Sequence, residues 1–280
     1  MAPGIERQLS FEEEKSSSSL RILVAGDAAV GKTRLCELLC SGSCSGHAVG
    51  DLAVMTEGPA GGQPQQEWTC GCTLSVVHET VEIDMRTVDV EVELWEVGGT
   101  KTYSCARPVF YDGLDAVILV YDVSNMKSYH NLVAWLFELC VSVVPPSLKY
   151  WDAGGGSGGV PDVDLELADS GAVQQGIFSG RFPVLFIANK CDLHSRGEVG
   201  ALPRPRPPEK PMLLDRLLGG GGESVSCRTP ADAVLMERLC DFILGGRHTE
   251  SSCRDGAKKF DFSCWQEFVR RVYQAKNRIG

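Results

Sequence analysis

Short apolar runs alternate along the chain with segments whose apolar residues recur at helical spacing. Residues 20–25, 116–121 and 184–188 are almost continuously apolar, which is typical of strands buried on both faces of a sheet. Residues 34–40, 132–139 and 233–244 instead place their apolar positions along one helical face. This alternation predicts an α/β fold with a doubly wound, mostly parallel sheet.

Two further strand-like segments, residues 74–83 and 88–95, follow each other closely. Between residues 80 and 89 charged and apolar positions alternate, which predicts an antiparallel hairpin with one exposed face. A short run at Val225 and Ser226 is a candidate for one more strand.

Segments without either pattern divide the chain into parts. Residues 1–19 are polar, acidic and rich in serine, so we expect a disordered extension there. Residues 145–181 and 195–222 are rich in glycine or proline and are expected to be flexible insertions. Together these features predict one folded domain over residues 20–247.

The last residues, 248–280, are predicted to form a tail with a short amphipathic helix. Its apolar stripe consists of Trp265, Phe268, Val269, Val272 and Tyr273. The pattern leaves three interpretations open: a helix packed on the domain, an interfacial membrane helix, or a helix that binds a partner.

The composition is that of an ordinary globular protein, with 43% hydrophobic residues in a chain of 280. A formal net charge of −10 argues against general nucleic-acid binding, which usually needs a basic surface. No apolar run approaches the roughly 18 residues of a membrane-spanning helix. The N-terminus also lacks the apolar core of a secretory signal.

The chain contains 12 cysteines but no Cys-x-x-Cys spacing. Several, such as Cys140 and Cys240, fall at apolar positions, where we expect them to act as small hydrophobic residues in a reducing compartment. We therefore expect a cytoplasmic protein. A metal site is the alternative at two groups of cysteines, although the usual ligand spacing and nearby histidines are lacking. These groups are the pair Cys70 and Cys72 and the series Cys36, Cys40 and Cys44.

The segment between the first strand and the first helix matches the phosphate-binding pattern G-x-x-x-x-G-K-[ST]. Such a loop turns its backbone N–H groups toward phosphate oxygens, and the following helix directs its positive end at them. Lys32 would reach the β- and γ-phosphates, and the Thr33 hydroxyl would bind Mg²⁺. The candidate phosphate-binding residues are Gly26, Asp27, Ala28, Ala29, Val30, Gly31, Lys32, Thr33 and Arg34.

A second motif selects the base. Asn189, Lys190, Cys191 and Asp192 follow the third apolar strand. A carboxylate such as Asp192 can accept both the ring N–H and the exocyclic amine of guanine, whereas adenine offers no such pair of donors. We expect Lys190 to lie along the base and to brace the phosphate loop. The sequence therefore predicts binding of GTP or GDP rather than ATP, with a P-loop kinase or ATPase as a distant alternative.

Together with Trp95-Glu96-Val97-Gly98-Gly99, these motifs resemble the phosphate, switch II and guanine motifs of small GTPases of the Ras/Rab superfamily. Within that superfamily the chain is similar to the Rab-like 3 subfamily. The residues that carry this similarity are Trp68-Thr69-Cys70-Gly71-Cys72, Glu93 to Gly99, Phe110-Tyr111, Val120 to Ser128, Asn131-Leu132 and Trp135. The resemblance implies that residues 20–247 form a P-loop G domain.

The resemblance also implies roles for individual residues. Thr69 corresponds to the switch I threonine that binds Mg²⁺ and contacts the γ-phosphate, so that Thr33 and Thr69 are the expected metal ligands. Gly99 corresponds to the switch II glycine whose N–H meets the same phosphate. The third guanine-contacting loop is assigned to Ser226, Cys227 and Arg228, which depart from the usual Ser-Ala-Lys.

Three departures from the family pattern bear on catalysis. Thr100 occupies the position of the glutamine that orients the attacking water, so it is the candidate catalytic residue with too short a side chain. Glu96 replaces the usual aspartate behind the metal, and Ala28 replaces a glycine or serine. Together they predict a GTPase with slow intrinsic hydrolysis of GTP to GDP and phosphate.

These features predict a molecular switch in intracellular signalling or vesicle trafficking, with effector and regulatory proteins as partners. The alternative is a non-cycling GTP-binding scaffold that recruits partners through its insertions and tail. No nucleic-acid partner is expected, and the ends of the sequence carry no prenylation or myristoylation signal, so no stable membrane anchor is expected either. The sequence leaves homodimerisation open.

Overall fold

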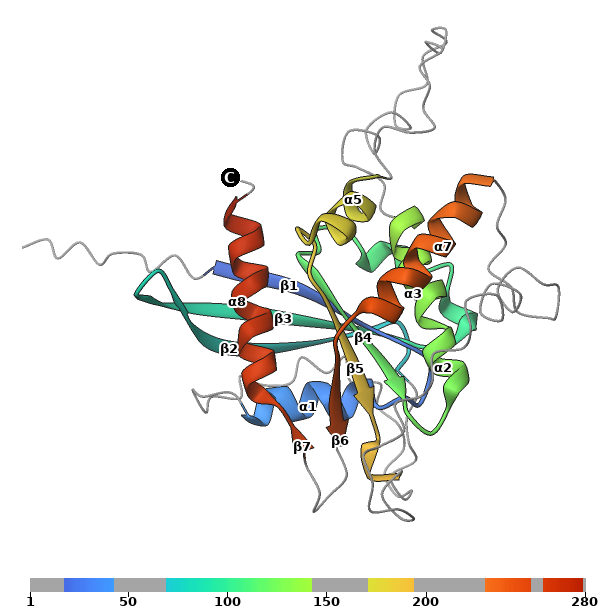
Figure 1. The fold of residues 1–280 in the computed structure, drawn as a ribbon. Helices are drawn as coiled ribbons and strands as arrows, with labels where there is room; N and C mark the ends of the chain where they lie inside the picture. Colours follow the sequence, from blue (N-terminus) through green and yellow to red (C-terminus); the bar gives the residue numbers. More distant parts are fainter. Residues whose placement is uncertain (1–17, 43–68, 143–170, 194–229, 253–258, 279–280) are drawn as a thin grey trace, which may run out of the picture.

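The computed structural model describes residues 18–42, 69–142, 171–193, 230–252 and 259–278. Within them, seven strands form one sheet in the order β2-β3-β1-β4-β5-β6-β7 (Figure 1). The strands are β1 (Ser18–Ala25), β2 (Cys72–Ile83), β3 (Arg86–Val97), β4 (Ala116–Asp122), β5 (Val184–Asn189), β6 (His248–Ser252) and β7 (Lys259–Phe260). The four neighbouring pairs from β3 to β6 are parallel, and the two outer pairs are antiparallel. The predicted mostly parallel α/β sheet is thereby confirmed.

The antiparallel pair β2 and β3 forms the predicted hairpin. Its strands stay in register from Cys72 opposite Val97 to Ile83 opposite Arg86. The turn residues Asp84 and Met85 adopt φ values of 48° and 64°, the left-handed geometry that matches the twist of a two-residue hairpin. At the open end of the hairpin, Gly98 lies against Thr69, and Gly99 lies against Asp27 and Ala28.

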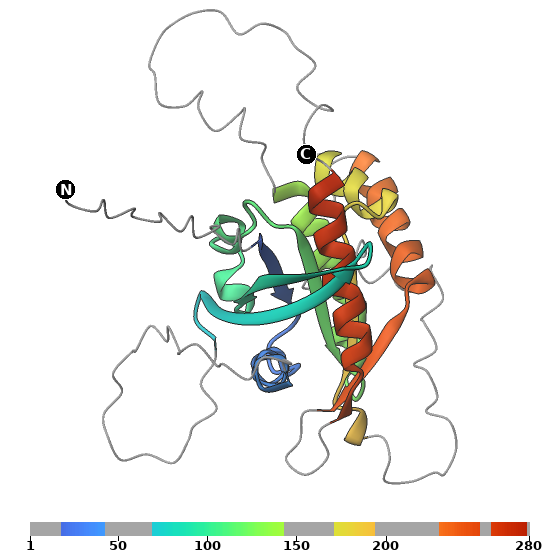
Figure 2. The same cartoon turned by 90° about the vertical axis from the view of Figure 1, so that its left-hand side faces the viewer.

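Helices cover both faces of the sheet (Figures 1 and 2). On one face Leu136 and Leu239 are fully buried in a core shared with β4 and β5, and on the other Leu35 and Val269 are fully buried against β1 and β3. The helices are α1 (Lys32–Gly42), α2 (Met126–His130), α3 (Leu132–Ser142), α5 (Gly171–Ser179), α7 (Pro230–Gly245) and α8 (Phe262–Arg278). In the described part of the chain, short 3₁₀ helices connect these elements: η1 (Lys101–Tyr103), η2 (Arg107–Phe110) and η3 (Cys191–Leu193).

The domain extends further in both directions than the predicted 20–247. At the N-terminus β1 already begins at Ser18, which pairs with Val90, although residues 1–19 were expected to be disordered. At the C-terminus β6 pairs with β5 in the same sheet. The predicted boundary at residue 247 is therefore wrong, because the free edge of β5 is completed by a strand that the sequence pattern did not reveal.

The predicted short tail helix is α8, a helix of 17 residues. Its stripe of Trp265, Phe268, Val269 and Val272 is buried against the sheet, and α8 passes alongside the hairpin of β2 and β3 (Figure 2). Of the three interpretations, the structure shows the helix packed on the domain. No helix among the described residues is long and apolar enough to cross a membrane.

One helix lies inside a segment that was expected to be a flexible insertion. In α5, within residues 145–181, Ile177 is 1% exposed and joins the core. A Cβ at Gly176 would lie 2.8 Å from Cβ of Phe182, so the glycine permits close packing rather than flexibility. Residues 145–170 of that segment lie outside the described residues, as do residues 1–17, the whole insertion 195–222, Val225 and Ser226.

The cysteines of the described segments are free thiols. Cys36, Cys140 and Cys240 are buried in the two cores, as the prediction of small hydrophobic residues requires. Burial raises the pKa of Cys72 and of Cys140 to about 12, which disfavours the thiolate needed for metal binding. The described residues contain no group of three or more potential metal ligands of the His, Cys, Asp or Glu type.

Candidate functional site

The phosphate loop joins the end of β1 to the start of α1, and its backbone conformation depends on two glycines. Gly26 and Gly31 adopt φ values of 145° and 95°. A Cβ at Gly26 would lie 2.2 Å from the Val120 carbonyl oxygen, and one at Gly31 would lie 2.3 Å from Nδ2 of Asn189. Both positions therefore require glycine, and the loop they form leads directly into the N-terminus of α1.

Lys32 lies within this loop, 5% exposed. Its Nζ donates hydrogen bonds of 2.9 Å to the carbonyl oxygens of Gly26 and Asp27. Burial lowers the pKa of Lys32, against the opposing influence of Glu96 and Asp27. The ammonium is thus held by neutral carbonyls in a partly desolvated place, where a phosphate oxygen would be a stronger partner.

The two predicted metal ligands come together on one carboxylate oxygen. The hydroxyls of Thr33 and Thr69 lie 2.7 and 3.1 Å from Oε1 of Glu96. Glu96 is 2% exposed, and its Oε2 has no hydrogen-bond partner among the described residues. Two hydroxyls beside a buried carboxylate with an unpartnered oxygen form a hard-oxygen donor set that fits Mg²⁺.

The switch II glycines lie directly against the phosphate loop and switch I. The Gly98 N–H donates to the Gly71 carbonyl across 2.9 Å. A Cβ at Gly99 would lie 2.3 Å from the backbone nitrogen of Ala28. The structure therefore brings Thr69, Gly99 and the phosphate loop into one place, as the sequence analysis anticipated.

Thr100 follows these glycines and stands at the N-cap of η1. Its hydroxyl makes no capping hydrogen bond, and Oγ1 is buried without a partner among the described residues. A threonine at an N-cap normally accepts from a backbone N–H of the first turn. Here the hydroxyl makes no such bond, one residue after Gly99, which lies against the phosphate loop.

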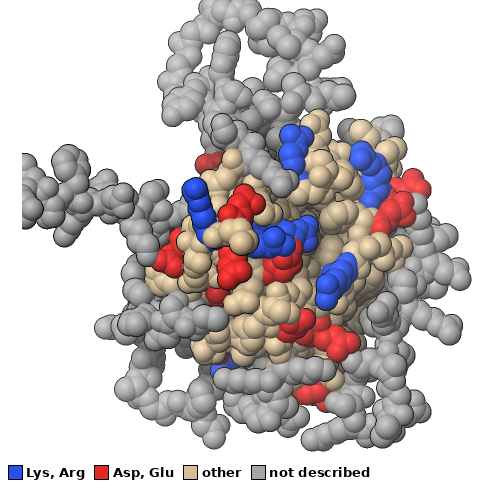
Figure 3. All heavy atoms as spheres, turned by 60° about the vertical axis from the view of Figure 1, so that its left-hand side comes forward, with Lys and Arg blue, Asp and Glu red and all other residues tan. Residues whose placement is uncertain are grey.

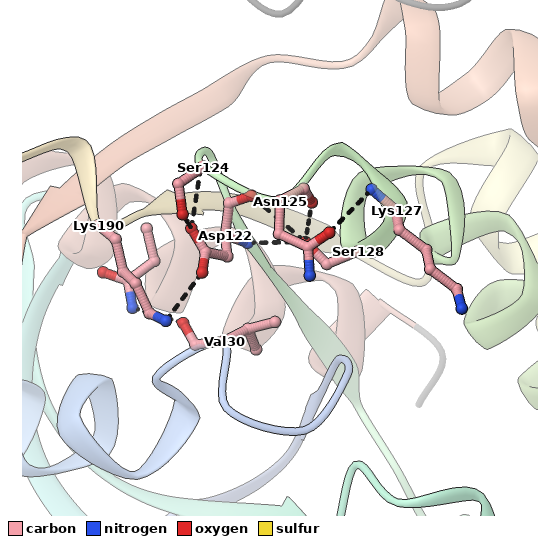
Figure 4. A network of polar contacts seen from close by, with 8 residues as sticks. Val30, Asp122, Ser124, Asn125, Lys127, Ser128 and Lys190 are labelled. Atoms are coloured by element: carbon pink, nitrogen blue, oxygen red, sulfur yellow. Dashed lines mark hydrogen bonds and ion pairs between the residues drawn. The ribbon is translucent and has the colours of Figure 1, made fainter. Parts of the chain in front are cut away.

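The end of β5 supplies the second half of the site (Figure 4). Asn189 donates from Nδ2 to the Val30 carbonyl across 2.8 Å, while Lys190 donates from Nζ to Oδ2 of Asp122 at the same distance. The residue that braces the phosphate loop is therefore Asn189 rather than Lys190. Burial opposes ionisation of Asp122, but the hydrogen bonds from Lys190 and Ser124 outweigh it and hold the pKa of that carboxyl below its ordinary value.

Asp192 is held by a residue that the sequence analysis missed. Ser252, the last residue of β6, donates from Oγ to Oδ1 of Asp192 across 2.8 Å. The predicted third loop, Ser226, Cys227 and Arg228, lies outside the described residues. A signal for the alternative was present, because Ser252, Cys253 and Arg254 repeat the same Ser-Cys-Arg triplet.

On the face shown in Figure 3, basic and acidic side chains are interspersed on the described part of the surface. Within the site, the groups that can attract an anion are Lys32, the loop N–H groups and the start of α1.

A phosphate loop after β1 of a mostly parallel sheet, two hydroxyls converging on a buried carboxylate, and an aspartate after β5 define a P-loop G domain. Comparisons with known proteins agree. The Ras family model matches residues 64–146. The chain is 33% identical to Rab-like protein 3 from Bos taurus over 128 residues. These aligned residues are 44% of this chain and 47% of that protein.

Two other relatives extend this comparison. The small GTPase-like protein LIP2 from Arabidopsis thaliana is 29% identical over 187 residues, or 64% of this chain and 44% of that protein. Ras-related protein Rab-18 from Lymnaea stagnalis is 32% identical over 129 residues, which is 46% of this chain and 53% of that protein. The chain thus spans about half the length of the curated relatives it matches. The chain is thus similar to small GTPases of the Ras/Rab superfamily, the Rab-like 3 proteins among them.

Proposed function

We propose that this protein binds GTP or GDP together with Mg²⁺ and acts as a nucleotide-dependent switch. The observation that carries the proposal is the convergence of three parts: the loop around Lys32, the Thr33–Thr69–Glu96 cluster, and Asp192 after β5. These are the parts needed for phosphates, metal and guanine, and they come from segments far apart in the sequence.

Each part has a distinct task in this proposal. Lys32 and the loop N–H groups hold the phosphates, and Asp192 accepts from the guanine N–H groups. Thr33 and Thr69 would hold Mg²⁺ beside Glu96, where the ion would neutralise phosphate charge. Because Thr69 belongs to switch I, loss of the γ-phosphate would release this segment and change the surface offered to partners.

For the third guanine loop we propose Ser252 rather than Ser226. Ser252 fixes the Asp192 carboxylate through a direct hydrogen bond, so the carboxylate is oriented before a base arrives. The hydrogen bond brings the end of β6 to the guanine end of the proposed site, which is where an N–H for the base oxygen is needed.

We expect intrinsic hydrolysis to be slow. Thr100 has neither the length nor the amide of the glutamine that usually positions the attacking water. This same feature favours the second candidate, a non-cycling scaffold that holds nucleotide without turnover. A partner that supplies an arginine would restore turnover in the switch, whereas the scaffold would show none.

The proposed role in the cell is supported by the similarity to Ras/Rab proteins. We propose effector and regulatory proteins as partners, in signalling or vesicle trafficking in the cytoplasm. Pulldowns with GDP-loaded and GTP-analogue-loaded protein separate the two candidates: different partners support the switch, and identical partners support the scaffold.

Nucleotide binding itself can be tested through the base. Wild-type protein should bind a fluorescent GDP analogue in competition with GTP but not with ATP. Asp192→Asn should weaken guanine binding by on the order of 1–3 kcal/mol, because it loses charged hydrogen bonds, and should gain affinity for xanthosine triphosphate, whose 2-oxo group can accept from the new amide. Arg270→Ala, which breaks only an exposed ion pair on α8, is the matched control. Equal competition by ATP and GTP would contradict the proposal.

A further inference from the structure

The side chain of Asp27 points from the phosphate loop toward α3. Its Oδ2 accepts from Nδ2 of Asn131 at 2.6 Å, and its Oδ1 accepts from the indole N–H of Trp135 at 3.0 Å. A carboxylate in a phosphate-binding loop would repel its ligand if it were free to turn toward it. Asn131, the C-cap residue of α2, and Trp135 on α3 hold the charge away from the ligand instead, while the Asp27 carbonyl accepts from Lys32.

The indole of Trp135 contacts a cation from the switch II region. The guanidinium carbon of Arg107, the first residue of η2, lies 4.1 Å from the centre of the Trp135 ring. Arg107 is 6% exposed and forms an ion pair with Glu138 across 2.9 Å. Tyr111 donates from its hydroxyl to the other oxygen of Glu138 at 2.7 Å.

These contacts form a continuous chain of alternating charge. It runs from Glu138 to Arg107, through the face of the Trp135 ring, to the carboxylate of Asp27. A cation over an indole face withdraws electron density, which makes the indole N–H a better donor to a carboxylate. Glu138 and Trp135 lie on α3, whereas Arg107 arrives from η2, so the chain exists only while η2 is seated.

The pair of Arg107 and Glu138 is poorly explained by stability alone. A buried ion pair contributes little net stability, because desolvation offsets the attraction. Nε of Arg107 has no hydrogen-bond partner among the described residues, which adds a further cost. A hydrophobic residue at position 107 would anchor η2 without the desolvation cost of the ion pair, but it would leave Trp135 without its cation.

We propose that Arg107 is a positioning residue that couples switch II to the phosphate loop through Trp135 and Asp27. The position of η2 then sets the rate of nucleotide release: when η2 moves off α3, the hold on Asp27 weakens and the phosphate loop loosens. This coupling rests on the proposed nucleotide binding, but the contacts that carry it are internal to the protein.

The kinetic test is a double-mutant cycle on the dissociation rate of a fluorescent GDP analogue at fixed Mg²⁺. Trp135→Phe keeps a ring for Arg107 and removes the N–H, and Arg107→Ala removes the cation. Each should speed release roughly fivefold, in line with the energy of such contacts. The double variant should be no faster than Trp135→Phe, because Arg107 acts through that N–H. Multiplying effects in the double variant would overturn the proposal.

Two further variants separate positioning from folding. Arg107→Lys keeps a cation that can stand over the Trp135 ring, so its release rate should lie closer to the wild type than that of Arg107→Ala. Arg270→Ala on α8, which breaks an exposed arginine–glutamate pair, should leave the release rate unchanged. If Arg107→Lys released nucleotide as fast as Arg107→Ala while keeping the thermal stability of the wild type, a cation over Trp135 would not be what slows release, and the proposed route would fail.

A second measurement needs no nucleotide. Hydrogen exchange of a peptide covering residues 26–33 in the nucleotide-free protein should be faster in Arg107→Ala and in Trp135→Phe than in the wild type. If the wild type bound no guanine nucleotide, the proposed function would fail while this exchange experiment still tested the coupling. Unchanged exchange in Arg107→Ala would overturn the coupling whether or not nucleotide binds.

Discussion

Ser252 at the end of β6 donates a hydrogen bond of 2.8 Å to the carboxylate of Asp192, 60 residues earlier in the chain. The contact exists because β6 runs parallel to β5, with Ala188 opposite Glu250, so that both strands end at the same edge of the sheet. Strand pairing therefore brings the end of β6 to Asp192, and this placement is the reason for proposing Ser252 in the third guanine loop.

Assigning the third guanine loop to Ser252 or to Ser226 predicts different effects of substitution on GDP affinity. Ser252→Ala should lower GDP affinity by about fivefold, because a single hydrogen bond to a charged group that orients the base is lost. Ser226→Ala should have a smaller effect. Titration of both variants with a fluorescent GDP analogue decides between them. A larger loss in Ser226→Ala would return the role to the first triplet.

The local parts of the site were predictable from the sequence, because each depends on residues close together in the chain. The phosphate loop needs only Gly26, Gly31 and Lys32 in one turn, and the hairpin needs only alternation. The choice between two identical triplets was not predictable, since it depends on which segment pairs with β5. That Asn189 rather than Lys190 braces the phosphate loop was not predictable either. It depends on the distances of the two side chains from Val30 and Asp122.

The same distinction explains the C-terminal region. The apolar stripe of α8 was visible in the sequence. Such a stripe indicates that one face of the helix is buried, but it does not indicate which element packs against that face. Trp265 has its place because β2 presents Glu79 to it, and these two residues are 186 positions apart. Long-range pairing of this kind leaves no periodic signal.

Glu96 offers a test of the metal cluster. Glu96→Gln removes the negative charge that faces Thr33 and Thr69, so Mg²⁺ binding should weaken and nucleotide release should become faster at limiting Mg²⁺. Release rates measured across a Mg²⁺ titration should shift to higher concentration by on the order of tenfold.

The same variant should behave differently without ligand. Because Oε2 of Glu96 is buried without a partner among the described residues, neutralising the carboxylate should not lower the stability of the nucleotide-free protein. A control is Glu91→Gln on the same strand, outside the cluster. An unchanged Mg²⁺ dependence in Glu96→Gln would contradict the assignment of the metal site.

Substitutions of Thr100 can distinguish slow GTP hydrolysis from no hydrolysis. Thr100→Gln restores an amide long enough to orient a water, so single-turnover hydrolysis should rise by on the order of tenfold or more. Thr100→Val keeps the shape and removes only a hydroxyl without a partner among the described residues, so it should retain the stability of the wild type. If Thr100→Gln hydrolyses GTP no faster than the wild type, the limit lies elsewhere, and the scaffold function gains support.

Glu79 predicts a pH dependence of stability. Burial raises the pKa of Glu79, and the hydrogen bond of 2.7 Å from the Trp265 indole opposes this only in part. The stability contributed by this group is therefore present below the ordinary glutamate pKa of 4.5 and is lost as pH rises through the folded pKa. Glu79→Gln keeps an acceptor for Trp265 but cannot ionise, so urea unfolding should show higher stability than wild type at about pH 7 and a smaller difference at about pH 5. Glu82→Gln, an exposed position on the same strand, is the control. A Glu79→Gln protein less stable than wild type at neutral pH would show that the charged form is the one the fold requires.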